Sequence, residues 1–208
     1  MPRRPAFVFL DLGNVIVTFD RERAHRQMAG VAGVPLEAVQ ATLAATRLEE
    51  RLERGLIDWD GFHAEFSRTI GTTPDPARLA DAASDMFALN VEMLPVIAGL
   101  ERAGIPIGIL SNTCGIHWDH LLGKRYAILP GNVRATVLSH EVAAIKPEPA
   151  IYAAAAARAG VAPERIFFCD DIPAHVEAAR GCGWDAEVFE SATGLIDALH
   201  RRGLNLGV

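Results

Sequence analysis

Short apolar runs alternate with helical patterns along most of the chain. Runs typical of strands buried on both faces of a sheet lie at residues 7–10, 105–110, 135–138, 166–169 and 186–189. A helical pattern ends at Gly104, and others cover 149–159, 173–180 and 194–202. Strands that alternate with helices form parallel sheets with helices on both faces. The pattern therefore predicts an α/β fold with a Rossmann-like parallel sheet.

A different pattern interrupts this alternation between residues 21 and 89. Apolar positions there recur at helical spacing, and Asp58 is a suitable N-cap for a helix over 59–70. We find no convincing strand in this segment. We expect residues 1–20 and 90–208 to form one core domain, with 21–89 inserted after the first strand as a helical cap domain. Such a cap over the carboxyl edge of the sheet would close a pocket and exclude water.

Composition narrows the class of protein. The 208 residues include 26 acidic and 20 basic side chains, give a net charge of -6 and form no basic tract, which argues against nucleic acid as a partner. The apolar run that ends at Leu10 is too short for a signal peptide or a membrane span, so we expect a cytoplasmic protein. The three cysteines lack CxxC spacing, and we interpret them as structural thiols. The pattern leaves the oligomeric state open.

Polar side chains follow four of the predicted strands. They are Asp11, Ser111 with Asn112, Lys146 (a little beyond its strand), and Asp170 with Asp171. Parallel strands end on one edge of a sheet, where ligands bind in open α/β folds, so we expect these groups to converge. Three carboxylates would repel each other, and Mg²⁺ relieves that repulsion while it accepts phosphate oxygens. With a lysine and a hydroxyl nearby, the set indicates a phosphoryl-transfer site.

The same residues give the chain a resemblance to a known family. Residues 11–15, 111–113, 146–147 and 170–171 resemble, in order, the four motifs of the haloacid dehalogenase-like hydrolases. The segment 21–89 resembles the helical cap that lies between the first two motifs. The first motif reads DLGNV, and it most resembles a bacterial branch that includes a glucose-1-phosphate phosphatase. That branch is related to the phosphatase domain of soluble epoxide hydrolase.

The resemblance implies a role for each matched residue. Asp11 would be the nucleophile, and Lys146 would pair with it and with the phosphoryl oxygens. Ser111 would bind the transferring phosphoryl group, with Asn112 as a second substrate-binding residue. The ligands implied for Mg²⁺ are Asp11, the backbone carbonyl of Gly13, Asp171 directly or through water, and Asp170 as a ligand or as an anchor behind the ligands.

Two positions depart from the family pattern. Most phosphatases of the family carry, where this chain has Gly13, an aspartate that protonates the leaving group, a role that usually contributes about 10²–10⁴-fold. Either another residue or a water substitutes for it, or the substrate has a good leaving group, or turnover is slow; we favour the first two. The gap also argues against a phosphomutase. His175 stands where the family often has asparagine, and we interpret it as a helix-surface residue that orients the loop, with proton transfer as the alternative.

Other candidate residues have simpler explanations. His117 and His120 lie three apart and would share a helix face, but without further ligands we prefer a surface helix to a transition-metal site. The cap side chains considered for contact with the substrate are Arg47, Arg51, Trp59 and Phe62. Cap helices mostly present core stripes and solvated arginines, so each of these is more simply explained without such a contact.

The leading hypothesis is a Mg²⁺-dependent phosphatase that acts on a small phosphorylated metabolite through an aspartyl-phosphate, with a sugar phosphate as one candidate. One alternative is a 2-haloacid dehalogenase, a relative that uses no metal and also lacks the second aspartate of the first motif. The paired Asp170 and Asp171 would then be hard to explain. Another alternative is a catalytically weak protein that binds a phosphometabolite, for which Gly13 is the only support.

Overall fold

A five-stranded parallel sheet forms the centre of the molecule. The computed structural model describes residues 3–123 and 133–207. The strands, in order across the sheet, are β5 (Val133–Leu138), β4 (Ile107–Ser111), β1 (Phe7–Leu10), β6 (Ile166–Asp170) and β7 (Asp185–Val188). All neighbouring pairs run parallel, which confirms the predicted α/β fold. The strand that leads to Asp11 therefore lies in the middle of the sheet.

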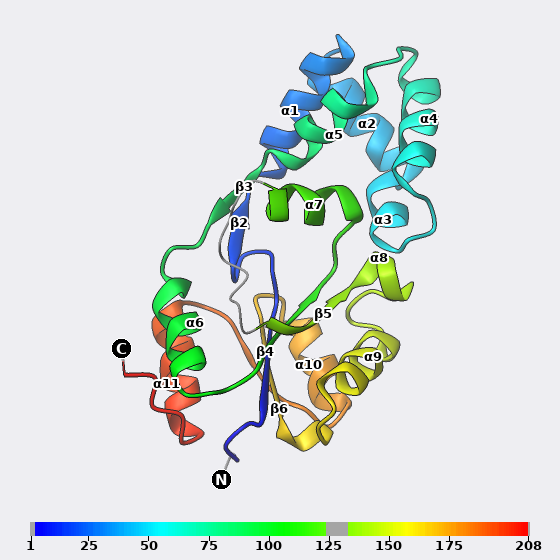
Figure 1. Ribbon diagram of the computed structural model, residues 1–208. Coiled ribbons are helices and arrows are strands. Elements are labelled where there is room, and N and C mark those ends of the chain that lie inside the picture. The colour runs from blue at the N-terminus through cyan, green and yellow to red at the C-terminus, as the bar shows by residue number, and fades with distance from the viewer. Residues whose placement is uncertain (1–2, 124–132, 208) are drawn as a thin grey trace.

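The two faces of the sheet are covered by different helices. Along β1, Val8 and Leu10 point to one face and Phe7 and Phe9 to the other, because successive side chains of a strand alternate. The helices are α6 (Met93–Arg102) and α11 (Ala192–Arg201) on the first face and α9 (Pro149–Ala159) and α10 (Pro173–Gly181) on the second, while the short 3-10 helix η1 (Pro163–Arg165) leads into β6. Figure 1 shows the sheet between these two pairs. An acid at the end of β1 thus enters surroundings with little water.

Five helices form a bundle beyond the carboxyl edge of the sheet (Figure 1). They are α1 (Arg21–Ala32), α2 (Leu36–Thr46), α3 (Leu48–Glu53), α4 (Trp59–Ile70) and α5 (Pro76–Ser84). The bundle has an apolar core of its own, in which Leu48, Phe66 and Leu79 are fully buried. Asp58 caps α4 as predicted, since its side chain accepts a hydrogen bond from the N–H of Gly61 at 2.8 Å. In the described part of the chain no single helix is long and apolar enough to cross a membrane, although α1 and α2 reach that length and composition as a pair bent by 108°.

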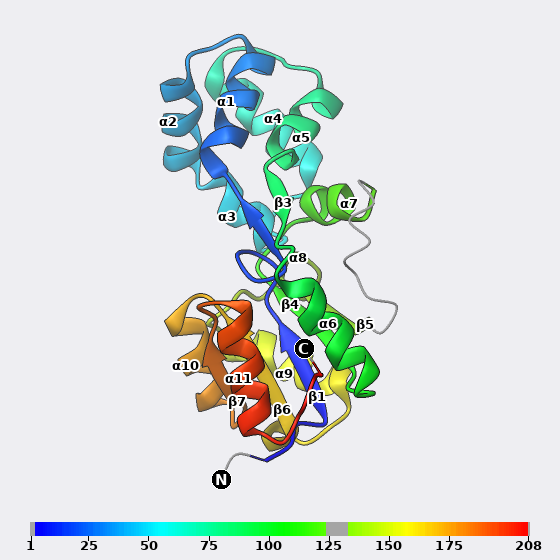
Figure 2. The ribbon, with the colours of Figure 1, turned by 90° about the vertical axis from the view of Figure 1, so that its left-hand side faces the viewer.

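A small antiparallel ribbon connects the sheet to the bundle. β2 (Val17–Phe19) pairs with β3 (Phe87–Leu89), so the two segments that cross between these parts lie side by side (Figure 2). The expectation that residues 21–89 contain no strand is therefore wrong. Strands of three residues are too short to show the alternation by which a strand is identified in a sequence. The division into a core domain and a cap domain at these boundaries stays a prediction.

The bundle also contacts the core through two further helices, α7 (Gly115–Gly123) and α8 (Ser139–Val142). Helix α7 packs against α5, and α8 lies against the end of α3 (Figure 1). At the second contact Gly55 has φ +66°, and a Cβ there would lie 2.4 Å from the carbonyl oxygen of His140. Only glycine permits this approach. The bundle is therefore held over the edge of the sheet where the polar residues gather.

Candidate active site

Lys146 joins three strand ends at the carboxyl edge of the sheet. Its Nζ lies 2.7 Å from Oδ1 of Asp11 and 2.5 Å from Oδ2 of Asp170, and it donates to the carbonyl of Leu110 at 2.9 Å. Asp11 is fixed in turn by its backbone N–H, which donates to the carbonyl of Cys169 at 2.9 Å. The three acceptors match the three N–H groups of the ammonium. A lysine side chain that is only 1% exposed is therefore fully paired.

Burial and charge affect the three groups differently. Burial raises the pKa of Asp11 to about 6, because the loss of water outweighs the attraction of Lys146. Burial opposes the charge of Lys146, but Asp11 and Asp170 outweigh it, so the lysine pKa lies above its ordinary value. Burial also opposes ionisation of Asp170, yet the hydrogen bond from His175 and the charge of Lys146 hold its pKa below its ordinary value. Of these two carboxylates, Asp11 is the one that would gain more from a further cation.

Asp170 lies behind the site rather than on its surface. It is fully buried, and its carboxylate accepts hydrogen bonds from Lys146, from the N–H of Ile172 at 2.8 Å and from Nδ1 of His175 at 3.0 Å. His175 is only 8% exposed in this contact. The expectation that His175 is a helix-surface residue is therefore wrong, because the first turn of α10 directs its ring back at the strand end. A role in proton transfer stays a prediction.

Asp171 completes a cluster of three carboxylates. One oxygen from each of Asp11, Asp170 and Asp171 lies within 4.8 Å of the other two. Oδ2 of Asp171 accepts a hydrogen bond at 3.0 Å from Nδ2 of Asn14, a residue whose φ of 55° lies in the left-handed region that asparagine tolerates. Several hard oxygen donors in a small space suit Mg²⁺. The structure thus brings together the acids that the sequence places at two separate strand ends.

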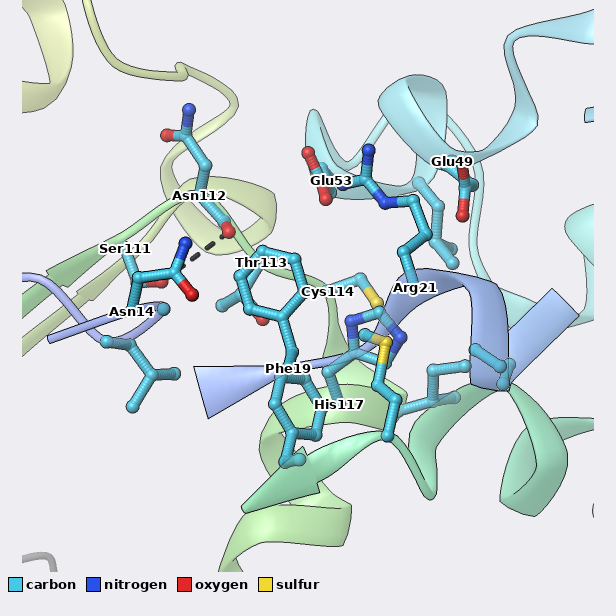
Figure 3. Close-up of a pocket in the computed structure, with 18 of the residues that line it drawn as sticks. Asn14, Phe19, Arg21, Glu49, Glu53, Ser111, Asn112, Thr113, Cys114 and His117 are labelled. Carbon is cyan, nitrogen blue, oxygen red and sulfur yellow. Dashed lines mark hydrogen bonds between the residues drawn. The ribbon is translucent and has the colours of Figure 1, made fainter. Parts of the chain in front are cut away.

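The loop after β4 carries the two residues expected to bind substrate. Ser111 is buried beneath the cavity, and its Oγ lies 3.5 Å from the carbonyl oxygen of Asn112. The Asn112 side chain points away from the other labelled residues (Figure 3). Its Nδ2 donates to the carbonyl of Lys146 at 3.0 Å, and its Oδ1 accepts from the Lys146 N–H at 2.7 Å. The amide of Asn112 thus holds the backbone of Lys146, and the residue also lines the cavity. A contact of Asn112 with the substrate stays a prediction.

A cavity of about 260 Å³ extends from these groups to the bundle. The sheet edge contributes Asp11, Ser111, Lys146 and Asp171, and the bundle contributes Arg21, Glu49, Glu53, Trp59 and Phe62. Figure 3 shows Arg21, Glu49 and Glu53 together on the side opposite Ser111 and Asn14. The lining thus combines a strongly polar end at the sheet with a mixed charged and aromatic end at the bundle.

Of the four cap residues considered from the sequence, two line the cavity and two do not. Trp59 and Phe62 line the cavity, and their stacked rings have centroids 4.9 Å apart. Arg47 and Arg51 form ion pairs with glutamates of the bundle and lie outside the described lining. The simpler interpretation holds for these two arginines.

Comparison with known proteins identifies the family. Residues 6–183 match the family described as haloacid dehalogenase-like hydrolase. The chain belongs to the haloacid dehalogenase-like hydrolases. Over 209 aligned residues it is 24% identical to phosphatase MT3486 of Mycobacterium tuberculosis, an alignment that covers 96% of this chain and 94% of that protein. The resemblance predicted from the motifs is confirmed at the level of the family.

Two solved structures of this family share the fold. The enzyme bt-2542 from Bacteroides thetaiotaomicron, described in complex with magnesium and inorganic phosphate, has a TM-score of 0.79 at 23% identity over 90% of this chain and 95% of that one. The L-2-haloacid dehalogenase from Xanthobacter autotrophicus has a TM-score of 0.61 at 22% identity over 88% and 76%. Membership of the narrower DLGNV branch stays a prediction.

In this haloacid dehalogenase-like hydrolase a phenylalanine ring fills the space beside Gly13. A Cβ at position 13 would lie 3.0 Å from Cε1 of Phe19, which is closer than side-chain carbons ordinarily pack. Phe19 lies on β2 and also lines the cavity. A carboxylate at position 13 would therefore require this ring to move. The role of the Gly13 carbonyl as a metal ligand stays a prediction.

His117 and Cys114, which follow β4 in the chain, line the cavity of this hydrolase. His117 lies on a helix as expected, but it is half-buried at the cavity rather than on the surface, and burial lowers its pKa to about 4. Its ring is therefore neutral near neutral pH. Cys114 is only 1% exposed, and burial raises its thiol pKa to about 12, so it stays protonated. Cys169 is buried and Cys182 half-buried, and all three thiols are free.

Sequence reasoning missed several residues of the site, among them Asn14, Arg21 and Glu53. Asn14 had a signal, because it lies within the first motif at a turn, and it supports Asp171. Arg21 and Glu53 had none, because a helical pattern does not show which part of a helix turns toward a cavity. Both line the bundle side of the cavity (Figure 3).

Proposed function

We propose that this chain is a Mg²⁺-dependent phosphatase that hydrolyses a small phosphorylated metabolite through an aspartyl-phosphate at Asp11. The observation that carries the proposal is the cluster of Asp11, Asp170 and Asp171, with Lys146 between the first two. The likeness to phosphatase MT3486 supports it, as does that to bt-2542, described with magnesium and phosphate. We further propose that the chain belongs to the DLGNV branch, that residues 21–89 form its cap, and that a sugar phosphate is one candidate substrate.

The donor set fits a hard divalent cation. Asp11 and Asp171 line the cavity, whereas the carboxylate of Asp170 is already engaged by Lys146, the N–H of Ile172 and a buried histidine. We therefore assign Asp11 and Asp171, with the carbonyl of Gly13, as direct ligands and Asp170 as the anchor behind them. When bound, Mg²⁺ would offset the repulsion among the acids and polarise the phosphoryl oxygens.

The chain's own residues supply the nucleophile and its support. A carboxylate oxygen of Asp11 attacks phosphorus, the bond from phosphorus to the ester oxygen breaks, and the departing oxygen takes a proton from a water molecule to leave as an alcohol, since Gly13 supplies no acid. A second water then attacks the phosphorus of the aspartyl-phosphate, and the bond from phosphorus to the Asp11 oxygen breaks. This step returns the carboxylate, releases inorganic phosphate and gives the proton of the attacking water back to the solvent. Lys146 holds Asp11 and adds positive charge beside the phosphoryl oxygens, and Ser111 offers its hydroxyl to one of them.

Gly13 also fits a 2-haloacid dehalogenase, in which Asp11 would displace a halide from carbon without a metal. The cluster argues against that reaction, because Lys146 offsets only one negative charge, and three carboxylates within 4.8 Å of one another leave an excess that a divalent cation would balance. Release of chloride from 2-chloropropionate in the absence of metal would instead identify a dehalogenase.

The decisive experiment measures hydrolysis of an aryl phosphate by the purified protein. We expect EDTA to abolish hydrolysis, Mg²⁺ to restore it and Asp11→Asn to abolish it in both conditions. Asp119→Asn, which removes an exposed carboxylate from α7, is the matched control and should retain activity. Hydrolysis that persists in EDTA or in Asp11→Asn would contradict the proposal. Tight binding without turnover across a broad panel of phosphate esters would point to a binding protein.

A further inference from the structure

Two charged side chains of the bundle, those of Glu53 and Arg21, line the cavity. Glu53 is the last residue of α3 and Arg21 the first of α1, and both lie across the cavity from Ser111 (Figure 3). In the described part of the chain the carboxylate of Glu53 makes no hydrogen bond and no ion pair. The guanidinium of Arg21 lies over the ring of Phe19, 6.0 Å from its centroid. Donor and acceptor capacity at this end of the cavity is therefore left for a ligand.

The core fixes the position of Glu53 through its backbone. The hydroxyl of Ser139 contacts the carbonyl oxygen of Glu53 at 2.6 Å and accepts a hydrogen bond from the N–H of Thr113 at 2.9 Å. The next residue, Arg54, forms an ion pair with Glu148 of the core at 2.7 Å. Glu53 is thus tied to the loop after β4 and to the start of α9. The backbone from which its side chain enters the cavity is therefore fixed relative to the sheet edge.

The surroundings of Glu53 make a ligand contact favourable. The apolar side chains of Met28, Leu52 and Phe62 line the same cavity and are buried. Burial raises the pKa of Glu53 to about 7, against the attraction of Arg21 and with the repulsion of neighbouring glutamates. Glu53 is half-buried, so its carboxyl group has lost part of its water, and a hydrogen-bond donor on a ligand would offset that loss.

We infer that Glu53 accepts a hydrogen bond from the leaving group of the substrate. The substrate class is then a phosphate monoester whose leaving group carries a hydroxyl or ammonium donor beside an apolar face. Arg21 is placed to donate to an oxygen of the same group, and Phe62 offers an aromatic ring to its apolar side. The inference rests on the proposed phosphatase function, because the phosphoryl group must lie at Asp11 for the leaving group to reach the bundle.

The test combines changes to Glu53 with changes to the substrate. Glu53→Leu and Glu53→Gln are compared with wild type on hexose phosphates, their deoxy analogues, phosphorylated amino alcohols and an aryl phosphate without hydroxyls. We expect Glu53→Leu to lower kcat/KM about 10- to 100-fold for the preferred donor-bearing substrate, as for a lost hydrogen bond to a charged group. Glu53→Gln, which keeps an acceptor, should lose less. For the substrate that lacks the critical donor, Glu53→Leu should not lower kcat/KM further, because the contact between that donor and Glu53 is already absent. Such a double-mutant cycle measures only the contact that the two changes have in common.

Several results separate this role from a structural one. The aryl phosphate should be hydrolysed nearly as well by Glu53→Leu as by wild type. Glu37→Gln, which removes an exposed carboxylate from α2, is the control for charge and should leave the ratios of kcat/KM between the substrates unchanged. An equal loss on all substrates, or additive losses across the whole panel, would overturn the inference. Preference for the hexose phosphates identifies the donor as a hydroxyl, and preference for the amino alcohols identifies it as an ammonium.

Failure of the phosphatase proposal has a different signature. In that case the aryl phosphate is not hydrolysed with Mg²⁺ even by wild type. The affinities of the phosphate esters are then measured by calorimetry for Asp11→Asn and for the double variant that also carries Glu53→Leu. Discrimination that depends on Glu53 would support the contact, and equal affinity for donor-bearing and donor-free esters would refute it.

Discussion

Replacing Asp11 with asparagine should stabilise the metal-free protein above neutral pH, although it removes the proposed nucleophile. The ionised carboxylate lies at a buried strand end, where burial raises its pKa from 3.8 to about 6 in spite of Lys146. Between those values the folded state binds more protons than the unfolded state, so stability falls as the pH rises through that window. Asparagine has nearly the same shape and does not titrate. The Asp11→Asn variant should therefore not lose stability as the pH rises through this window.

The expected size follows from the shift. Each pKa unit corresponds to about 1.4 kcal/mol, so the shift of Asp11 destabilises the folded wild type by about 3 kcal/mol above about pH 7. At about pH 5 the integrated loss is about half as large, because the folded carboxyl is still mostly protonated there. The advantage of Asp11→Asn should therefore grow by about 1–2 kcal/mol between about pH 5 and about pH 8.

Urea unfolding followed by circular dichroism, in EDTA and at both pH values, measures this difference. Asp119→Asn, on the exposed side of α7, controls for the loss of one carboxylate. If Asp11→Asn is less stable than wild type at the higher pH, the attraction between Lys146 and Asp11 exceeds the desolvation of Asp11, and the reasoning fails. Mg²⁺ should narrow the gap, because a ligand that binds the folded wild type more tightly than the variant stabilises it preferentially.

Two further predictions concern Gly13, beside the nucleophile, and Ser139, which joins the core to α3. Gly13→Asp alone should raise hydrolysis of esters with poor leaving groups little, because Phe19 occupies the space, whereas Gly13→Asp with Phe19→Ala should raise it further. Equal rates for the single and double variants, with folding intact, would show that the ring is no obstacle. Ser139→Ala should lower the free energy of unfolding by about 1–3 kcal/mol, because it removes the hydroxyl that accepts from the buried N–H of Thr113 and contacts the carbonyl oxygen of Glu53. Urea denaturation measures that change, and a neutral result would mean that a water replaces the hydroxyl.

The central sheet could be predicted because burial on both faces leaves a direct mark in the sequence. The runs at 7–10 and 166–169 are continuously apolar, and each is followed by an acid. Since parallel strands end together, the convergence of Asp11, Asp170 and Asp171 needed only the order of strands and helices. The strand bounds shifted by one or two residues, so that Asp170 belongs to β6 itself.

The features that escaped prediction depend on side-chain direction and on short elements. The ribbon of β2 and β3 has three residues in each strand, too few for a pattern. Asn112 stands in a motif, yet the backbone that its amide holds lies 34 residues away in the chain. His175 lies on a helix, but whether its ring faces solvent or Asp170 depends on how α10 leaves β6. Such choices are made by tertiary packing and not by local sequence.

Phe19 belongs both to the ribbon and to the space beside Gly13, and this shared position has a consequence for the family's history. An acid at position 13 and a large ring at position 19 compete for one volume. In related sequences the two positions should therefore covary, with an aromatic residue at the second accompanying glycine at the first and a smaller one accompanying aspartate. A lineage that exchanged one state for the other would have had to alter both sites, and since β2 carries the chain into the bundle, it would have remodelled the cap entrance in the same step.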